Sequence, residues 1–99
     1  MYATACATAD ALGIGGQAVV YDTCNACLGV MNALFQVANA IELGQIRAGM
    51  VVSCESARSI VDLTIERMVR DPSMEMFKKS MATMTGGSGA IGIVLTDAA

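Results

Sequence analysis

The hydrophobic positions of this 99-residue chain fall into two kinds of pattern, continuous apolar runs and helical repeats. Short continuous runs, roughly four to eight residues long, are typical of strands that are buried on both faces. Three segments fit that description: Ala18–Tyr21, Met50–Cys54 and Ala90–Leu95. Because segments with helical character separate them, the pattern predicts an α/β architecture with a sheet covered on each side.

Four helices are predicted around these strands. They span Thr4–Leu12, Cys27 to about Arg47, Ser59–Val69, and a stretch after Pro72 that ends at Met84. Ser73 is a suitable N-cap for the last of them, because its hydroxyl can accept a hydrogen bond from a free backbone N–H of the first turn.

The segment from Cys27 to Arg47 has apolar residues on nearly every face, which predicts a buried helix. Its few polar side chains, Asn32, Gln36 and Asn39, follow the spacing i, i+4 and i+7. They therefore form one narrow stripe that we expect to face a neighbouring chain or buried water.

Composition indicates that much of this surface belongs inside a larger protein. Hydrophobic residues make up 55% of the chain and charged residues only 15%. A chain of this size buries only roughly 60–65% of the surface that its unfolded state exposes. With so few polar side chains to cover the outside, we expect a fragment of a longer enzyme.

Net charge and targeting signals limit the classes of partner and the location that we expect for the protein. A net charge of -3 without a basic patch argues against nucleic-acid or anionic-membrane binding. Residues 23–41 carry no charge, but three asparagines and a glutamine there argue against a membrane span. No signal peptide is recognisable near Met1, so we expect a cytoplasmic protein whose four cysteines are reduced thiols.

The segment Tyr21-Asp-Thr-Cys-Asn-Ala-Cys27-Leu-Gly-Val30 carries the candidate chemistry. A strand that runs through a tight turn into a helix places Cys27 at the helix N-terminus. Free backbone N–H groups and the helix dipole favour a thiolate there, and the same N–H groups can donate to an oxyanion. The sequence therefore makes Cys27 a candidate nucleophile, with Gly29 leaving room for a substrate.

Other interpretations of the cysteines stay open from the residues alone. Most free cysteines are small buried hydrophobes, and the chain has no histidine to activate Cys27. The spacing of Cys24 and Cys27 also fits a redox pair. A zinc site would need Cys6 and Cys54 as well, at spacings unlike those of zinc knuckles.

Three motifs in this order resemble the thiolase superfamily: Asp-x-x-Asn-Ala-Cys-Leu-Gly, Ile-Glu-Leu-Gly-Gln-Ile-Arg-Ala-Gly, and Thr-Gly-Gly-Ser-Gly-Ala. Within it the chain is similar to 3-oxoacyl-(acyl-carrier-protein) synthase III-like enzymes. The greatest similarity is to the olefin-biosynthesis acyl-CoA condensing branch, the OleA type. The resemblance implies one partial thiolase-fold domain over residues 1–99, from the amino-terminal half of the enzyme. Its mixed sheet would have about three strands beside a buried, nucleophile-bearing helix.

The resemblance also implies an activity in lipid metabolism such as fatty acid biosynthesis. An acyl group passes from a thioester to Cys27, and a Claisen condensation with a second acyl thioester follows. Gly86, Gly87 and Gly89 match the glycine loop beside the acyl pocket. Arg67 lies close to a family arginine that meets the CoA nucleotide, although a solvated arginine on a helix surface is the alternative.

The same resemblance implies the binding partners of the chain and the limits of its activity on its own. We expect acyl-CoA or acyl carrier protein as partners, a homodimer, no metal and no cofactor beyond the thioester. The family's catalytic histidine and asparagine have no counterpart here, so the chain alone should at most be acylated or alkylated at Cys27. A hydroxymethylglutaryl-CoA synthase-like enzyme and a non-catalytic assembly module are the alternatives.

Overall fold

The computed structural model describes residues 4–98, which contain four α-helices, one short 3-10 helix and two strands. The chain divides into two compact units. One contains the residues up to Val52 together with those from Gly92 onward, and the other spans Ser53–Ile91. The elements are α1 (Thr4–Ala11), η1 (Ala26–Leu28), α2 (Gly29–Glu42), β1 (Ala48–Glu55), α3 (Arg58–Arg70), α4 (Met74–Met84) and β2 (Gly89–Thr96). The expectation of a single domain stays a prediction.

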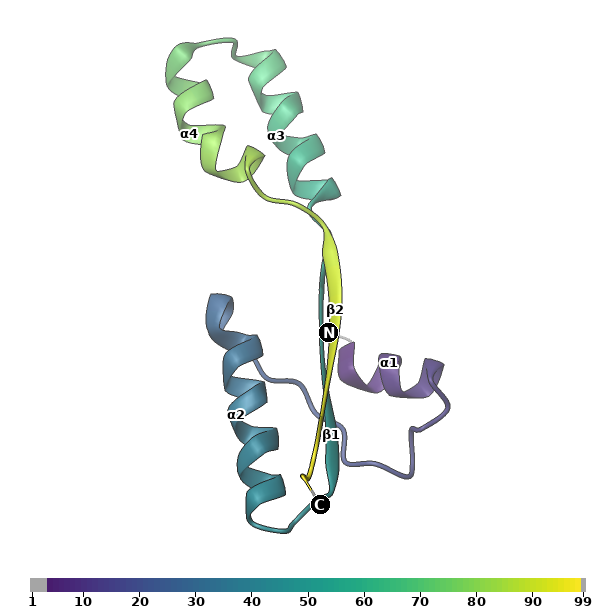
Figure 1. Cartoon of the computed structure of the whole chain (residues 1–99). Coiled ribbons are helices and arrows are strands. Elements are labelled where there is room, and N and C mark those ends of the chain that lie inside the picture. The colour runs from purple at the N-terminus through teal and green to yellow at the C-terminus, as the bar shows by residue number, and fades with distance from the viewer. Residues whose placement is uncertain (1–3, 99) are drawn as a thin grey trace. The chain divides into compact units, whose positions relative to one another are not determined.

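Strands β1 and β2 pair in a two-stranded sheet (Figure 1). The N–H of Asp97, just after β2, donates to the carbonyl of Arg47, just before β1, at 3.0 Å, so the strands are antiparallel. Along β1, Gly49, Val51 and Ser53 are more buried than the residues between them. This period of two shows that one face of the strand is covered and the other is exposed.

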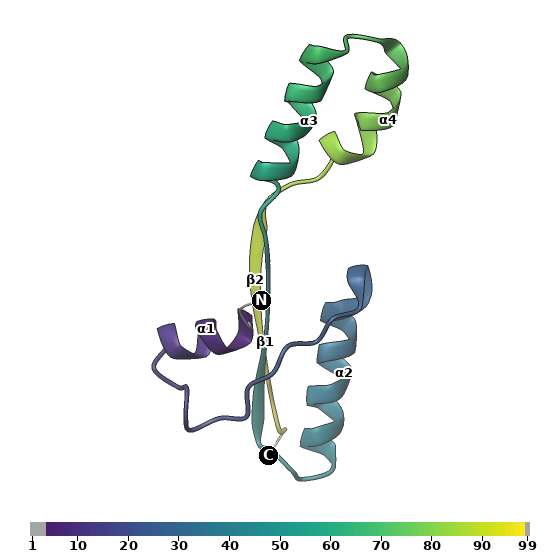
Figure 2. The ribbon, with the colours of Figure 1, turned by 180° about the vertical axis from the view of Figure 1, so that it is seen from behind.

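Helix α2 lies against the covered part of β1. A Cβ built on Gly49 would meet the side chain of Val37, so the helix and the strand are in contact at this glycine. In the unit that contains them, α1 and α2 lie on opposite sides of the strand pair (Figures 1 and 2). The buried apolar side chains of the described residues are Ala9 in α1 and Val51 in β1.

The helix predicted from Cys27 to about Arg47 ends earlier, at Glu42. Gly44 has φ +75°, in the left-handed region that glycine adopts most readily. Its N–H donates to the carbonyl of Ile41 at 3.0 Å, and the N–H of Gln45 donates to that of Ala40 at 2.9 Å. This is a Schellman motif, which ends the helix by giving its last carbonyls partners.

The second unit holds α3 and α4, which pack against each other side by side (Figures 1 and 2). Their positions confirm the predicted helices. The predicted cap is also confirmed, because the Ser73 hydroxyl accepts a hydrogen bond from the N–H of Met76 at 3.2 Å. Ser80 of α4 is buried.

The predicted strand Ala18–Tyr21 does not form. These residues have no regular secondary structure, and the sheet of the described residues has two strands where about three were expected. Val19 is 87% exposed. A run of apolar and β-branched residues forms a strand only when another strand pairs with it. Here Tyr21, the last residue of the run, instead donates a hydrogen bond to Gln36 of α2.

Helix α2 is also less buried than predicted. None of its residues falls in the buried class, and Phe35 is 62% exposed. The reason is geometric, because a two-stranded sheet covers only one side of a helix. The apolar residues on its other sides therefore face outward within the described residues.

Candidate active site around Cys27

The backbone before Cys27 is extended and lies along α2. Tyr21 and Thr23 both donate through their hydroxyls to Oε1 of Gln36, at 3.1 and 3.4 Å. Asn25 donates through Nδ2 to Oδ1 of Asn32. Gln36 and Asn32 of the polar stripe on α2 thus bind the segment that precedes the helix. The prediction that this stripe faces a neighbouring chain or buried water is wrong for these two residues.

Alternate residues of the same segment point the other way, as expected for extended backbone. The carboxylate of Asp22 accepts a hydrogen bond from the N–H of Ala5 at 2.8 Å. That N–H belongs to the first turn of α1, where a negative charge is favourable and a free donor needs a partner. The segment is therefore attached to α1 on one side and to α2 on the other.

The turn into the helix is tight. Ala26 has φ +42°, a left-handed conformation that costs a residue with a Cβ about 1–2 kcal/mol. The N–H of Leu28 donates to the carbonyl of Asn25 at 2.8 Å, and that of Gly29 donates to the carbonyl of Ala26. These bonds close η1, which leads directly into α2.

Cys27 is the middle residue of η1, and its side chain is exposed. Its N–H makes no hydrogen bond to another described residue, so the donor is free beside the thiol. A thiol and a free N–H at the start of a helix are two of the groups that an attack on a thioester carbonyl uses. Gly29 is not needed for space inside the chain, since a Cβ there would meet only the carbonyl of Thr23, at an ordinary 3.6 Å.

The other three cysteines are exposed free thiols as well. Cys6 lies in α1, Cys54 lies in β1, and Cys24 lies in the extended segment. Among residues 4–98, no three histidine, cysteine, aspartate or glutamate side chains gather as a metal site requires. What sets Cys27 apart is its position at the helix start and not its exposure.

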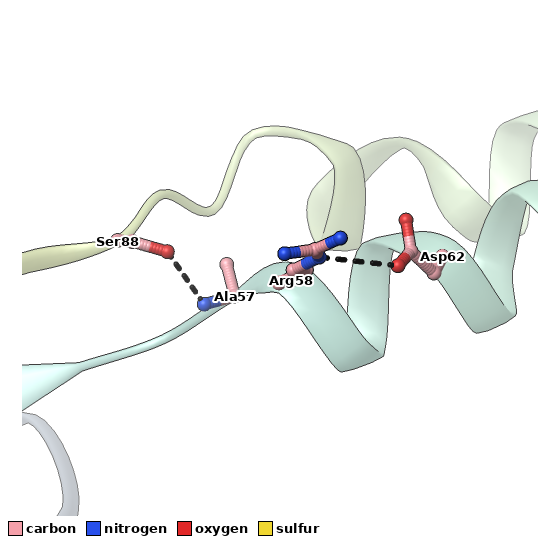
Figure 3. Close-up of polar contacts among 4 residues, drawn as sticks. All are labelled: Ala57, Arg58, Asp62 and Ser88. Carbon is pink, nitrogen blue, oxygen red and sulfur yellow. Dashed lines mark hydrogen bonds and ion pairs between the residues drawn. The ribbon is translucent and has the colours of Figure 1, made fainter.

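The glycine loop follows α4 in the second unit, and its last glycine, Gly89, is the first residue of β2. Its Ser88 accepts a hydrogen bond from the N–H of Ala57 at 2.9 Å (Figure 3). Ala57 is the residue before α3, so the loop serine closes the start of that helix. A Cβ added to Gly87 or Gly89 would meet nothing within 4 Å, so packing within the chain does not require glycine there.

Arg67 lies on the exposed surface of α3, in the same unit as the glycine loop. The other two arginines of α3, Arg58 and Arg70, form i, i+4 ion pairs with Asp62 and Glu66 (Figure 3 shows the first pair). Arg67 forms no ion pair within the described residues. This fits the alternative of a solvated surface arginine. Cys27 belongs to the other unit, and each group of predicted site residues is described within its own unit.

Comparison with known proteins shows what the segment is similar to. The acyl-CoA:acyl-CoA alkyltransferase of Shewanella oneidensis is 60% identical over 95 residues, which is 96% of this chain. The enzyme of the same name from Xanthomonas campestris pv. campestris is 33% identical over 93 residues. A crystal structure of a glutamate-to-glutamine variant of Xanthomonas campestris OleA superimposes with a TM-score of 0.88 over 97% of this chain, at 32% identity.

The resemblance to the OleA-type enzymes is confirmed. The α/β, thiolase-like fold is confirmed with it, although the chain contributes two paired strands to that fold. A second OleA structure, a histidine-to-asparagine variant with cerulenin, gives a TM-score of 0.87 at 32% identity over 97% of this chain. No protein-family model matches the chain.

The match is to a part of these enzymes. The chain spans 27% and 28% of the length of the two curated relatives, and about 30% of the superimposed OleA chain. Within the described residues, no helix is long and apolar enough to cross a membrane.

Cys27 lies at the helix start, as the sequence predicts, but the side chains that hold the turn were not predicted. The signal was present in two parts. Tyr21, Thr23 and Asn25 alternate as hydrogen-bonding residues at a period of two, and Asn32 and Gln36 share a face of a helix that begins four residues later. An extended segment and a helix with matched polar faces, joined by a tight turn, can fold back on each other.

Proposed function

We propose that this chain supplies the nucleophile-bearing segment of an enzyme that condenses two acyl thioesters. The observation that carries the proposal is the position of Cys27, an exposed thiol with a free N–H in the turn that enters α2. The likeness of the whole segment to acyl-CoA:acyl-CoA alkyltransferases supports the substrate class.

The first step is acyl transfer. The sulfur of Cys27 attacks the carbonyl carbon of an acyl thioester, the carbon–sulfur bond of the substrate breaks, and the released thiol takes the proton. The N–H of Cys27 donates to the oxygen that becomes negatively charged in the tetrahedral intermediate. This donor forms one half of an oxyanion hole.

The second step is carbon–carbon bond formation. The α-carbon of a second acyl thioester, after losing a proton, attacks the carbonyl of the acyl-Cys27, and the sulfur leaves to give a β-ketoacyl thioester. This step needs a base and further oxyanion donors, and the chain contains no histidine. Residues 1–99 alone are therefore proposed to accept an acyl group without condensing it.

The remaining expectations form part of the same proposal. The small residues at Gly86, Gly87 and Gly89 would let backbone approach an acyl chain, and Arg67, exposed on α3, would meet the CoA nucleotide. Acyl carrier protein is the alternative donor of the thioester, and no other cofactor takes part. Exposed apolar residues such as Val94 support homodimer formation, and a cytoplasmic location is part of the same proposal.

A segment exchange tests the proposal. Residues 4–98 replace the matching segment of the Shewanella oneidensis enzyme, which is 60% identical to this chain over 95 residues. The chimera should form β-ketoacyl product from acyl-CoA, and Cys27→Ser should abolish both product and acyl-enzyme detected by intact-protein mass spectrometry. Cys24→Ser is the matched control, a thiol three residues away, and should retain activity. An active Cys27→Ser chimera, or an inactive unmutated chimera, contradicts the proposal.

A further inference from the structure

The hydrogen bonds between the extended segment and α2 have a feature that the proposed reaction does not use. Gln36 receives two hydroxyl donors, from Tyr21 and Thr23, and Asn32 receives the amide of Asn25. Gln36 and Asn32 are one helical turn apart, so they bind the segment at two successive levels of α2. We call the five side chains the polar clamp.

The polar clamp determines where the turn begins. Asn25 is fixed to α2 by its side chain, and its own carbonyl accepts the N–H of Leu28 at 2.8 Å. The backbone must therefore reverse within Ala26 and Cys27, which explains why an alanine adopts φ +42°. Without the clamp, the strained Ala26 could relax and η1 could fray, because no buried packing holds this turn.

We propose that Asn32 and Gln36 are positioning residues for Cys27, which act by fixing the segment Tyr21–Asn25 on α2 so that η1 holds the thiol and its N–H at the helix start. The relevance to catalysis rests on the proposed function. The positioning itself does not, and it is measurable without any acyl substrate.

Matched substitutions separate hydrogen bonding from general helix stability. Asn32→Leu and Gln36→Leu remove the acceptors, although leucine favours helix more than asparagine or glutamine does. Asn32→Asp and Gln36→Glu keep an acceptor oxygen at each position. Asn39→Leu and Asn39→Asp are the controls, since Asn39 lies on the same stripe and makes no side-chain hydrogen bond to another described residue.

The first readout is amide hydrogen exchange of the 99-residue chain by NMR. The N–H groups of Leu28 and Gly29 report on η1, and that of Ala38 reports on the middle of α2. The leucine variants should lower protection at Leu28 and Gly29 by about two- to ten-fold, the population ratio that corresponds to one hydrogen bond. Protection at Ala38 should stay unchanged, and the acceptor-keeping variants should behave like the unmutated chain.

The second readout is the rate of iodoacetamide labelling at Cys27 relative to Cys54, resolved by peptide mass spectrometry. Both thiols are exposed, so access does not limit either rate. The leucine variants should lower the Cys27 rate, and with it this ratio, toward the Cys27 rate of a synthetic peptide spanning residues 21–32, and the Asn39 variants should change neither. Unchanged exchange and labelling in the leucine variants overturn the proposal, as does a loss of protection that extends equally to Ala38. An active Cys27→Ser chimera would end the proposed function and leave this result standing.

Discussion

The contact between α2 and β1 at Gly49 predicts that a single methyl group will loosen the first unit. A Cβ on Gly49 would lie 2.5 Å from Cγ1 and 3.3 Å from Cγ2 of Val37. Carbon atoms pack best at about 3.5–4.0 Å. Valine in a helix keeps one χ1 rotamer in about 90% of cases, so Val37 cannot easily turn away. Gly49→Ala must therefore move the helix from the strand.

The size of the effect follows from two opposing terms. Inserting a methyl group into a packed contact costs about 1–3 kcal/mol. Replacing a strand glycine by alanine regains about 0.5–1 kcal/mol, because the unfolded chain becomes less flexible. The difference lies between about 0 and 2.5 kcal/mol, and its centre gives an expected loss of about 1 kcal/mol in the free energy of unfolding.

Val37→Ala should relieve the clash. It removes both methyl groups and leaves Cβ, which would lie 3.5 Å from the new Cβ at residue 49, an ordinary contact. The double variant should therefore be more stable than the sum of the single changes predicts, by about 1–2 kcal/mol. Gly92→Ala in β2 is the control, since a Cβ there meets nothing within 4 Å and should not destabilise the chain.

Urea unfolding followed by circular dichroism measures these differences. With a slope of about 1 kcal/mol per molar urea, the midpoint of Gly49→Ala should fall by about 1 M. An equal or higher midpoint would refute the contact. Strict additivity of the two substitutions would also refute it, because the clash would then not involve Val37.

Three further predictions concern single positions. Ser73→Ala should lower the free energy of unfolding by about 1 kcal/mol through loss of the α4 cap, measured in urea, whereas Ser59→Ala on exposed α3 should change it by less than about 0.5 kcal/mol. Ala26→Gly should stabilise the chain by about 0.5 kcal/mol, because glycine adopts the left-handed conformation of Ala26 without strain. Ala26→Val should destabilise it by at least about 1 kcal/mol. Thermal unfolding measures both, and equal midpoints of the two variants would contradict the prediction. Gly87→Ala should leave thermal unfolding of the chain unchanged but reduce the activity of the chimera, and full activity would remove the loop from the acyl pocket.

The start of one helix could be predicted from the sequence, whereas the end of another could not. Ser73 after a proline predicted the start of α4, and the structure shows the capping bond. The end of α2 was missed by several residues, although Gly44 was visible in the sequence. Helix-forming residues continue beyond it, and only the left-handed φ at Gly44 shows that the helix has already ended.

The strand prediction at Ala18–Tyr21 failed for a different reason. Apolar β-branched residues describe what a strand can be, but a strand exists only when a partner offers its backbone. Here the next residues form side-chain bonds to α2, and Val19 stays exposed. The pattern within the segment cannot tell these outcomes apart, because the partner lies elsewhere in the sequence.

The candidate site also has a part that neighbouring residues determine and a part that needs residues from elsewhere. Among the described residues, the features that shape the surroundings of Cys27 lie within Tyr21–Gln36, apart from the contact of Asp22 with α1. They are the extended segment, the left-handed turn, the free N–H and the polar clamp. Such a local structure loses little loop-closure entropy when it forms, because the residues that meet are close in sequence. The proposed condensation needs in addition a base and further oxyanion donors, and this chain contains no histidine. Acylation at Cys27 and condensation should therefore be separable steps, the first encoded by this segment and the second by the assembly around it.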